Sequence, residues 1–423
     1  MNGRSELHEV ARLCRESDAW RQETVNLIAS ENVLSPCARR LLDSDFHHRY
    51  AEGHPGKRYY EGTRFIDEIE EKTRRIVGEV FKADRVDVRL PSGTLANEAA
   101  FSALVPHGST ALAHGLDGGG HISHARFGAL GKRTAKIVEL PRLPDGYRLD
   151  AARARDLIRA ERPRIIVLGR SLFLFPEPVR EIKEACVEAG ALILYDASHV
   201  LGLIAGGTFQ DPLGEGCDLF TASTHKTYFG PQRGIIVARG KDEEFWKPID
   251  RAVFPGVTSN HHLFSLPSLY AATHEVREFG AAYAQAIVRN ARALAAQLHR
   301  RGFPVDAADL GYTASHQVAV DVSAHGGGRD AARRLAASGI ICNMNVLPGR
   351  AGQTPLRPCG IRLGVQEMTR FGMGEAEMAR IAELIHACLV LGKEVGEECR
   401  KLRSEHAEIR FGYRSEEAEL ART

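Results

Sequence analysis

Three short segments of the sequence combine residue types that could hold a phosphorylated carbonyl cofactor. In TASTHKTYFGPQRG (221–234), Lys226 lies among hydroxyl side chains, next to a histidine and ahead of a Gly-Pro turn. Most lysines are solvated surface groups, but a hydroxyl-rich loop leading to an apolar strand suits an amine that forms a Schiff base. We therefore predict that Lys226 is the reactive amine.

An acidic residue at the end of an apolar run could balance the charge of such a cofactor. LYDASH (194–199) puts Asp196 at the carboxyl end of a predicted buried strand, where ligands bind in open α/β sheets. A buried carboxylate needs a cationic partner, and the protonated pyridine nitrogen of pyridoxal phosphate would supply one. The competing interpretation is an aspartate that caps a helix.

A phosphate site is predicted where a tight turn opens a helix. In PSGTLANEAAFSAL (91–104), Ser92, Gly93 and Thr94 would present hydroxyl and backbone N–H groups at a helix N-terminus. Alone, this segment could equally be an ordinary helix cap. Together with the lysine and the aspartate, it indicates a pyridoxal phosphate enzyme.

The elements that must position these residues alternate between strands and helices. Apolar runs at 164–169, 191–196 and 234–238 are expected to be buried parallel strands, and 177–190 a helix that stops at a glycine. This alternation predicts an α/β fold with a doubly wound, mostly parallel sheet.

A different pattern begins near residue 269. A long Ala-rich helix is expected over 269–303, followed by a smaller α+β unit with a strand at 316–322 and helices at 329–339 and 375–395. The predicted organisation is an N-terminal arm (1–35), a large cofactor-binding domain (36–268), and an interdomain helix with a C-terminal small domain (269–423).

Composition and charge exclude several classes of function. The 423 residues carry a formal net charge of +2, which argues against a broad surface for nucleic acid or anionic membrane. No apolar run approaches the ~20 residues of a membrane helix, and the first residues do not resemble a secretory signal. The eight cysteines form no CxxC pair or zinc-like cluster, so we expect reduced thiols, no metal and a cytoplasmic location.

The three segments belong to a longer series of motifs that resembles one family. The likeness runs from about residue 20 to 400. The matching stretches are NLIASEN (26–32), RYAEGHPGKRYYEG (49–62), GGHISH (119–124), YDASHVLGLIAGGTFQDPL (195–213), STHKTYFGPQ (223–232), VFPGVTSNHH (253–262) and GIRLGVQEMTRFGM (360–373). By these motifs the chain resembles serine hydroxymethyltransferase, most closely the archaeal-type branch. The resemblance implies a fold-type I pyridoxal phosphate transferase with a seven-stranded sheet. It also implies interconversion of serine and glycine, with tetrahydrofolate or another reduced pterin as co-substrate.

The resemblance implies a role for each residue around the cofactor. Lys226 would form the Schiff base, and Asp196 would pair with the pyridine nitrogen. His121 would stack on the pyridine ring, although without the family a surface histidine in a glycine-rich loop would be the simpler interpretation. The remaining implied cofactor contacts are Ser92, Gly93 and Thr94 at the phosphate, Ser171 and His199 near the phenolic oxygen, and Ser223 and His225 beside the lysine.

Other matching residues are implied to contact the amino acid. Arg362 would clamp its carboxylate, a bidentate task that suits a guanidinium, although an exposed ion-pair arginine is the alternative. Ser30 would add a second carboxylate contact. Glu52 would move protons at the substrate hydroxyl, with Tyr50 and Tyr60 lining that pocket.

The same resemblance implies that two subunits share each active site. In the family, the residues matching Tyr50, Glu52 and Tyr60 reach the site from the neighbouring subunit. Gly256 likewise would help to complete the phosphate cup across the interface. A homodimer with shared active sites is therefore expected.

Several positions depart from the family pattern near the one-carbon acceptor. Glu61 stands where many members have glycine, the FPG segment lacks a second glycine, and Met344 replaces a commonly basic residue. The insertion of Asp117 and Gly118 lengthens a loop. The implied pterin contacts are Leu116, Gly119 and Asn345.

These departures keep two alternatives open. The first is a pterin-independent threonine aldolase or L-threonine transaldolase, which would use the same Schiff-base residues. The second is a binding protein that has lost the cofactor, which the presence of Lys226, Asp196, His121 and Arg362 disfavours.

Overall fold

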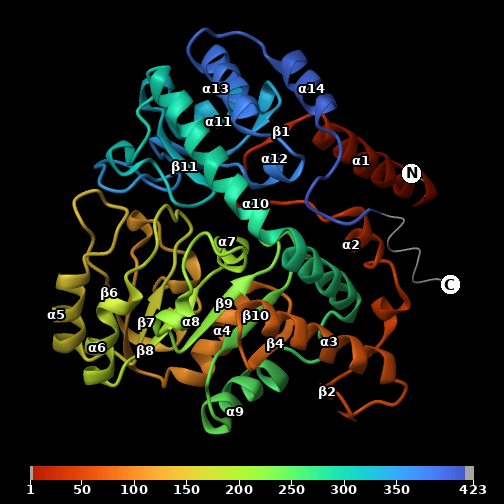
Figure 1. Ribbon diagram of the computed structural model, residues 1–423, viewed down its shortest axis with the longest axis vertical. Coiled ribbons are helices and arrows are strands. Elements are labelled where there is room, and N and C mark those ends of the chain that lie inside the picture. The colour runs from red at the N-terminus through yellow and green to blue at the C-terminus, as the bar shows by residue number, and fades with distance from the viewer. Residues whose placement is uncertain (1–2, 415–423) are drawn as a thin grey trace.

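The computed structural model describes residues 3–414, arranged around a large sheet and a smaller one (Figure 1). The helices are α1 (Gly3–Gln22), α2 (Pro36–Arg40), α3 (Arg64–Phe81), α4 (Gly93–Leu104), α5 (Ala151–Glu161), α6 (Val179–Ala189), α7 (Leu201–Ala205), α8 (Pro212–Glu215), α9 (Glu243–Arg251), α10 (Leu266–Arg300), α11 (Gly327–Ala337), α12 (Gln366–Arg370), α13 (Glu375–Leu389) and α14 (Gly396–Glu405). The strands are β1 (Val25–Asn26), β2 (Gly53–His54), β3 (Lys57–Arg58), β4 (Arg85–Leu90), β5 (Ser109–Ala113), β6 (Thr134–Glu139), β7 (Ile165–Leu168), β8 (Leu192–Asp196), β9 (Leu219–Ser223), β10 (Gly234–Ala238), β11 (Gln317–Asp321), β12 (Ile340–Ile341), β13 (Asn343–Asn345) and β14 (Gly360–Gly364).

The large sheet has seven strands in the order β4-β10-β9-β8-β7-β5-β6. Five of them, from β9 to β6 in that order, run parallel, whereas β10 is antiparallel to both β4 and β9. The mostly parallel seven-stranded sheet is therefore confirmed, but the expectation of a parallel strand at 234–238 is wrong. Residues 224–233 join β9 to β10 without a helix, and parallel strands need a crossover of about a dozen residues or more.

Helices cover both faces of the large sheet, as the doubly wound prediction requires. Alternate residues of one strand face opposite sides: Ile165 and Val167 belong to a core with α4 and α9, whereas Ile166 and Leu168 belong to a core with α5, α6 and α10. Because both faces are buried, the strands are continuous apolar runs rather than alternating ones. The helix expected at 177–190 is confirmed as α6, which Gly190 ends in the left-handed conformation at φ 70°.

The smaller sheet lies beyond the long helix α10, which crosses the middle of the molecule (Figure 1). Its three antiparallel strands have the order β11-β14-β13; α11 packs beside β13 and β14, α10 contacts β11, and α13 packs on α10 and α11. Residues 269–303 were expected to be helical, and α10 covers most of them. The last nine residues of the predicted 269–423 unit and the first two of the 1–35 arm lie outside the described residues.

One edge of the large sheet gathers the predicted site segments. Because β10 is antiparallel to both its neighbours, β4 runs in the same direction as β8 and β9. The carboxyl ends of β4, β5, β7, β8 and β9 therefore share one edge, the place where open α/β sheets bind ligands. No helix among residues 3–414 is both long enough and apolar enough to cross a bilayer.

Candidate active site

Lys226 lies three residues beyond the end of β9, in a buried loop. Its side chain is almost inaccessible, and Nζ makes no hydrogen bond or ion pair with any residue between 3 and 414. Burial is the main reason that its pKa falls to about 8, opposed by the charge of Asp196 and assisted by that of Arg362. Near physiological pH an amine with this pKa is mostly protonated, but its neutral, nucleophilic fraction is far larger than that of an ordinary lysine.

Asp196 ends β8 and is held by three neighbours. Its Oδ2 accepts hydrogen bonds from Asn97 Nδ2 at 2.8 Å and pairs with His124 Nε2 at 3.1 Å, while Oδ1 accepts from the Ser198 backbone N–H at 3.0 Å. Burial alone would raise the pKa of Asp196, but the interactions with its neighbours, the hydrogen bond with His124 foremost, outweigh burial and hold this pKa well below its ordinary value. The carboxylate is therefore ionised and suited to a cationic ring nitrogen.

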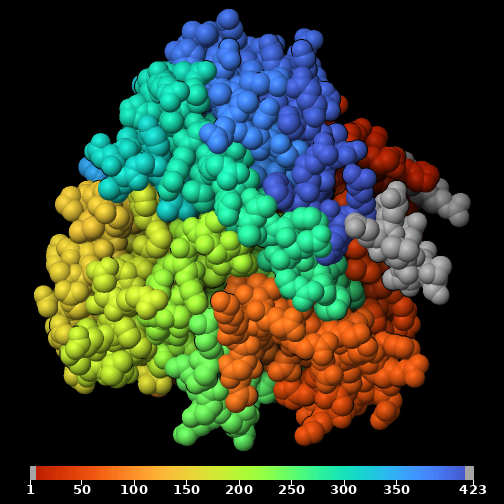
Figure 2. Space-filling view, in the orientation of Figure 1, coloured from red at the N-terminus to blue at the C-terminus, as the bar shows by residue number. Residues whose placement is uncertain are grey.

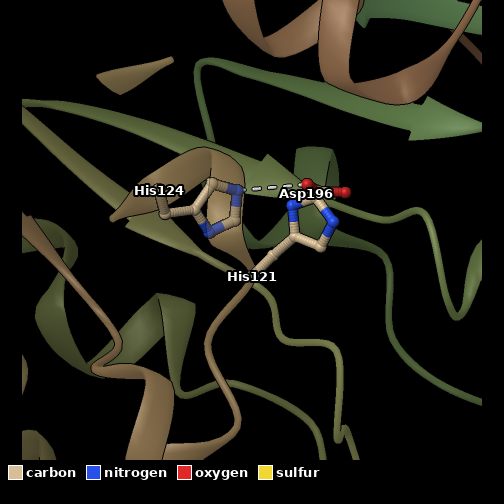
Figure 3. Close-up of side chains that lie close together, drawn as sticks. All are labelled: His121, His124 and Asp196. Atoms are coloured by element: carbon tan, nitrogen blue, oxygen red, sulfur yellow. Dashed lines mark hydrogen bonds and ion pairs between the residues drawn. The ribbon is translucent and has the colours of Figure 1, made fainter. Parts of the chain in front are cut away.

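His121 and His124 flank this carboxylate, as Figure 3 shows. The nearest ligand atoms of His121, His124 and Asp196 lie within 4.8 Å of one another, so the group could hold a metal ion. However, His124 and Asp196 already bind each other, and Asn97 occupies the same carboxylate oxygen. Burial lowers the pKa of His121 to about 4, so its ring is neutral and free to cover an aromatic ligand. The group is therefore better suited to an aromatic ligand than to a metal ion.

The N-terminus of α4 fits a phosphate. Ser92 caps the helix by accepting from the Leu95 N–H at 3.2 Å, and within the described chain the N–H groups of Gly93 and Thr94 donate to no protein acceptor. A Cβ at Gly93 would meet Ser223 Oγ at 2.3 Å and Ser198 Oγ at 3.0 Å. This close cradle requires glycine, and the free donors at the helix start favour an anion.

Arg362, on β14 of the smaller sheet, brings a buried cation to the site. Its Nη1 donates to the Ser171 carbonyl at 2.6 Å and its Nε to Asn343 Oδ1 at 3.1 Å. No carboxylate among residues 3–414 pairs with it, and burial lowers its pKa to about 10. A buried guanidinium without an anionic partner is suited to the carboxylate of a ligand.

The structure brings most predicted cofactor contacts into one pocket. Gly93, Thr94, His121, Asp196, His199, Ser223 and Lys226 line it together. Ser171 adjoins it through the carbonyl that Arg362 contacts. His225 lies beside Lys226; burial lowers its pKa to about 4, and its Nδ1 has no partner in the described part of the chain.

Another predicted group does not line this pocket. Tyr50 and Tyr60 are 54% and 44% exposed, and their ring centroids lie 5.3 Å apart. Glu52 is half-buried. Gly256 is also exposed, in a short irregular helical turn at Ala252–Val257. Within this chain, these residues therefore do not contribute to the pocket around Lys226.

The remaining predicted contacts are not among the residues that line this pocket. The Gly119 carbonyl accepts from the Ser171 N–H at 2.7 Å, and Gly119 adopts φ 83° in a turn that ends the short helix Leu116–Gly118. Asn345 ends β13 and donates to the Val346 carbonyl at 2.6 Å. Ser30 is half-buried and follows Ala29, whose carbonyl contacts His316.

Four residues at the site were not predicted from the sequence. Asn97, Arg170 and Ser198 line the pocket, and His124 holds Asp196. Two local signals existed: Asn97 lies one helical turn beyond Gly93, and His124 lies three residues beyond His121. Arg170 precedes Ser171, but nothing around it in the sequence distinguishes it from a surface arginine.

The buried amine, the anchored aspartate and the anion-binding helix start define a class of protein. On a doubly wound sheet, this combination is that of a fold-type I pyridoxal phosphate-dependent transferase. A family model for serine hydroxymethyltransferase matches residues 5–385. The chain belongs to the serine hydroxymethyltransferase family.

Individual relatives support the same assignment. Proteins named serine hydroxymethyltransferase from Thermoplasma volcanium and Methanothermobacter thermautotrophicus are each 46% identical; the alignments cover 96% and 97% of this chain and 95% and 96% of theirs. The archaeal-type likeness is thereby confirmed. A solved structure of L-threonine transaldolase from Pseudomonas fluorescens, in its internal aldimine state, aligns with a TM-score of 0.90 at 28% identity, covering 99% of this chain and 97% of that one.

Proposed function

We propose that this protein catalyses the reversible conversion of serine and a reduced pterin to glycine and the one-carbon pterin adduct. One observation carries the proposal. Among residues 3–414, the buried amine of Lys226 has no hydrogen-bond or ion-pair partner, and the buried guanidinium of Arg362, whose charge acts on that amine, has no carboxylate partner. An amino acid carries the carboxylate that such an arginine needs. The family membership supports serine and glycine as that amino acid.

Pyridoxal phosphate, when bound, supplies an electron sink that allows a bond to the substrate α-carbon to break. Lys226 would hold its carbonyl carbon, and Asp196 would hold the proton of its ring nitrogen. Ser92, Gly93 and Thr94 would bind its phosphate. These assignments fit the free N–H donors of α4 and the cradle at Gly93.

The chain's own groups would orient the substrate and move its protons. Arg362 and Ser30 would bind the substrate carboxylate, which fixes the position of the α-carbon. Glu52 would take the proton of the serine hydroxyl and return it in the reverse direction. Tyr50 and Tyr60 would line the space around that hydroxyl.

A homodimer would bring Tyr50, Glu52, Tyr60 and Gly256 into the site of the neighbouring subunit. Their positions on the surface of this chain support that proposal. So does α1, which lies at the rim of the molecule (Figure 2) and exposes Leu7, Val10, Leu13 and Trp20. Exposed apolar clusters of this kind are typical of interaction surfaces.

The pterin would lie against Leu116, Gly119 and Asn345, near the junction of the two sheets. The proposed domain division follows the predicted arm, large unit and small unit, with α10 joining the two sheets. We propose the cytoplasm as the compartment, because the eight cysteines are scattered along the sequence with no CxxC pair or zinc-like spacing, as in proteins of reducing environments.

L-threonine transaldolase is the second candidate function, favoured by the structural likeness to that enzyme. It would share the Schiff-base residues and differ at the acceptor. The higher identity over nearly the full length favours the hydroxymethyltransferase.

The test combines covalent mapping with turnover. Purified protein loaded with pyridoxal phosphate would be reduced with borohydride and its peptides mapped, with Lys226→Ala as the matched variant. We expect the label on Lys226 and serine turnover that depends on tetrahydrofolate. A label on another lysine, or normal turnover by Lys226→Ala, would overturn the proposal.

A further inference from the structure

Gln317 links the smaller sheet to the candidate active site. It is the first residue of β11 and is fully buried, and its side chain reaches three groups of the large-sheet region. The Phe173 N–H donates to Oε1 at 2.7 Å. Nε2 lies 3.0 Å from the Ser171 carbonyl and 2.9 Å from His199 Nδ1.

The chemistry of these partners fixes which way the amide points. A backbone N–H can only donate, so the atom facing Phe173 must be the amide oxygen. A backbone carbonyl can only accept, so the atom facing Ser171 must be the amide nitrogen. Both ends agree, and the alternative orientation would break both hydrogen bonds. The two N–H bonds of Gln317 are therefore directed at the Ser171 carbonyl and at His199 Nδ1.

His316 does not compete for those donors, although its Nε2 lies 3.4 Å from Gln317 Nε2. That His316 nitrogen faces the Ala29 carbonyl at 3.0 Å, so it must carry a proton and cannot accept from the amide. Instead, the His316 ring stacks on His199, with centroids 5.6 Å apart and planes at 16°. The imidazole of His199 is therefore contacted by both the Gln317 amide and the His316 ring.

We propose that Gln317 is a positioning residue that holds His199 as the neutral tautomer with its proton on Nε2. Because Nδ1 accepts from Gln317, a proton there would set two donors against each other. His199 lines the pocket with Lys226, and its Nε2 has no hydrogen-bond partner among residues 3–414. The tautomer therefore leaves an N–H donor for an oxygen of whatever occupies the pocket. That this oxygen is the phenolic oxygen of the cofactor rests on the proposed function.

The experiment measures the tautomer directly, in the protein without cofactor. Protein labelled with ¹⁵N-histidine would be examined by long-range ¹H–¹⁵N NMR correlation. If the protonated nitrogen correlates strongly with both ring C–H protons it is Nε2, and if it correlates strongly with only one it is Nδ1. His199→Gln identifies the relevant signals by their loss. We expect wild-type His199 to show the protonated-Nε2 pattern; a protonated-Nδ1 or doubly protonated pattern at neutral pH would overturn the proposal.

Variants of Gln317 test the cause. Gln317→Glu keeps the acceptor for Phe173 but puts a carboxylate oxygen against His199 Nδ1, so the proton should move to Nδ1 or both nitrogens should be protonated. Gln317→Leu introduces no buried charge and removes the hydrogen bond to His199 Nδ1. His199 in this variant should therefore show a mixture of the two tautomers in place of the protonated-Nε2 pattern alone. Gln366→Leu is the control, since this equally buried glutamine donates to the Ile28 and Glu31 carbonyls instead. An unchanged protonated-Nε2 pattern in a folded Gln317→Leu protein would overturn the positioning role.

The two proposals can fail separately. The tautomer is read without cofactor or substrate, so an absence of serine turnover would leave this result intact. Conversely, normal wild-type turnover with the wrong tautomer would remove only the role of Gln317.

Discussion

Arg362 donates from Nη1 to the backbone carbonyl of Ser171 at 2.6 Å, which joins the smaller sheet to the carboxyl edge of the large one. This contact satisfies one N–H group and leaves the charge without an anion among residues 3–414. The same contact fixes the guanidinium before substrate arrives, so less side-chain entropy is lost on binding.

Replacing Arg362 should therefore weaken substrate binding while the cofactor stays bound. Loss of a charge-assisted bidentate contact costs roughly 1.5–3 kcal/mol of binding free energy. The dissociation constants of Arg362→Ala for serine and for glycine should therefore rise about 10- to 150-fold. Arg362→Lys should recover only part of this, because an ammonium lacks the planar fork. Arg334→Ala is the control, since that arginine of the same unit donates to the Cys388 and Leu389 carbonyls. Unchanged substrate constants in Arg362→Ala would reassign it to a structural role.

The buried amine of Lys226 predicts a pH-dependent stability. Burial lowers its pKa from 10.5 to about 8 in the folded chain. Between these values the unfolded chain binds more protons, so the free energy of unfolding rises with pH, by roughly 2 to 4 kcal/mol from this group. The gain is absent below pH 8 and complete above pH 10.5.

Urea unfolding of the cofactor-free protein at about pH 7 and about pH 10 measures this effect. Because cysteines and tyrosines in general titrate over the same range, the quantity to compare is the change in unfolding free energy with pH. The contribution of Lys226 is the change in the wild type minus the change in Lys226→Met. Lys136→Met is the control, because that exposed lysine forms a surface ion pair with Glu161 at 2.6 Å. A Lys226→Met variant whose stability changes with pH as the wild type does would contradict the prediction.

Local chemistry explains which parts of the site could be predicted. The cap at Ser92, the aspartate at the end of β8 and the lysine after β9 depend on residues adjacent in sequence. The roles of Asn97 and Gln317 could not be predicted, because their partners, Asp196 and His199, are about a hundred residues away in the sequence. A polar side chain on a helix or strand carries no local mark of a partner that only the fold provides.

The predicted direction of β10 was wrong for a related reason. An apolar run of five residues is compatible with a buried strand of either direction. Only the length of the preceding connection, 224–233, distinguishes the two, and that requires knowing that β9 and β10 are neighbours. The expected role of Glu52 and its neighbours requires a second chain, so the fold of one chain alone does not test it.

Arg58 supports the loop that carries Glu52. Its guanidinium donates to the carbonyls of Ala51 and Gly53, both at 2.7 Å, and to Glu70 Oε2 at 2.8 Å. Arg58→Ala would leave Glu70 buried with only His261 as a partner, so unfolding free energy should fall by about 3–5 kcal/mol. Urea unfolding checks this, with Arg159→Ala as the control. That exposed arginine pairs with Glu188, and its loss should change the free energy of unfolding far less, because water screens a surface ion pair. Equal effects of the two substitutions would contradict the buried-pair argument.

Glu52 is predicted to act on the substrate hydroxyl rather than in binding. Glu52→Gln keeps size and hydrogen-bonding capacity but removes proton transfer, so pterin-dependent serine turnover should fall about 10²- to 10⁴-fold. Serine affinity should change little, because the substitution leaves the proposed carboxylate contact at Arg362 in place. Stopped-flow turnover and a binding titration on the same protein separate the two quantities. A large loss of affinity with normal turnover would assign Glu52 to binding instead.

The choice of acceptor decides between the two candidate reactions, and the wild-type protein can answer it. The serine hydroxymethyl group needs an acceptor, so its removal should be strongly accelerated by tetrahydrofolate. Threonine releases a stable aldehyde, so its cleavage should be slow and indifferent to the pterin. A transaldolase would give the reverse pattern. The loop at Asp117, which forms an ion pair with Arg142 at 2.7 Å, adjoins the proposed pterin contacts Leu116 and Gly119. Arg142→Ala should therefore change the apparent constant for tetrahydrofolate without altering threonine cleavage. Threonine cleavage that outruns serine turnover and ignores tetrahydrofolate would exclude the hydroxymethyltransferase reaction.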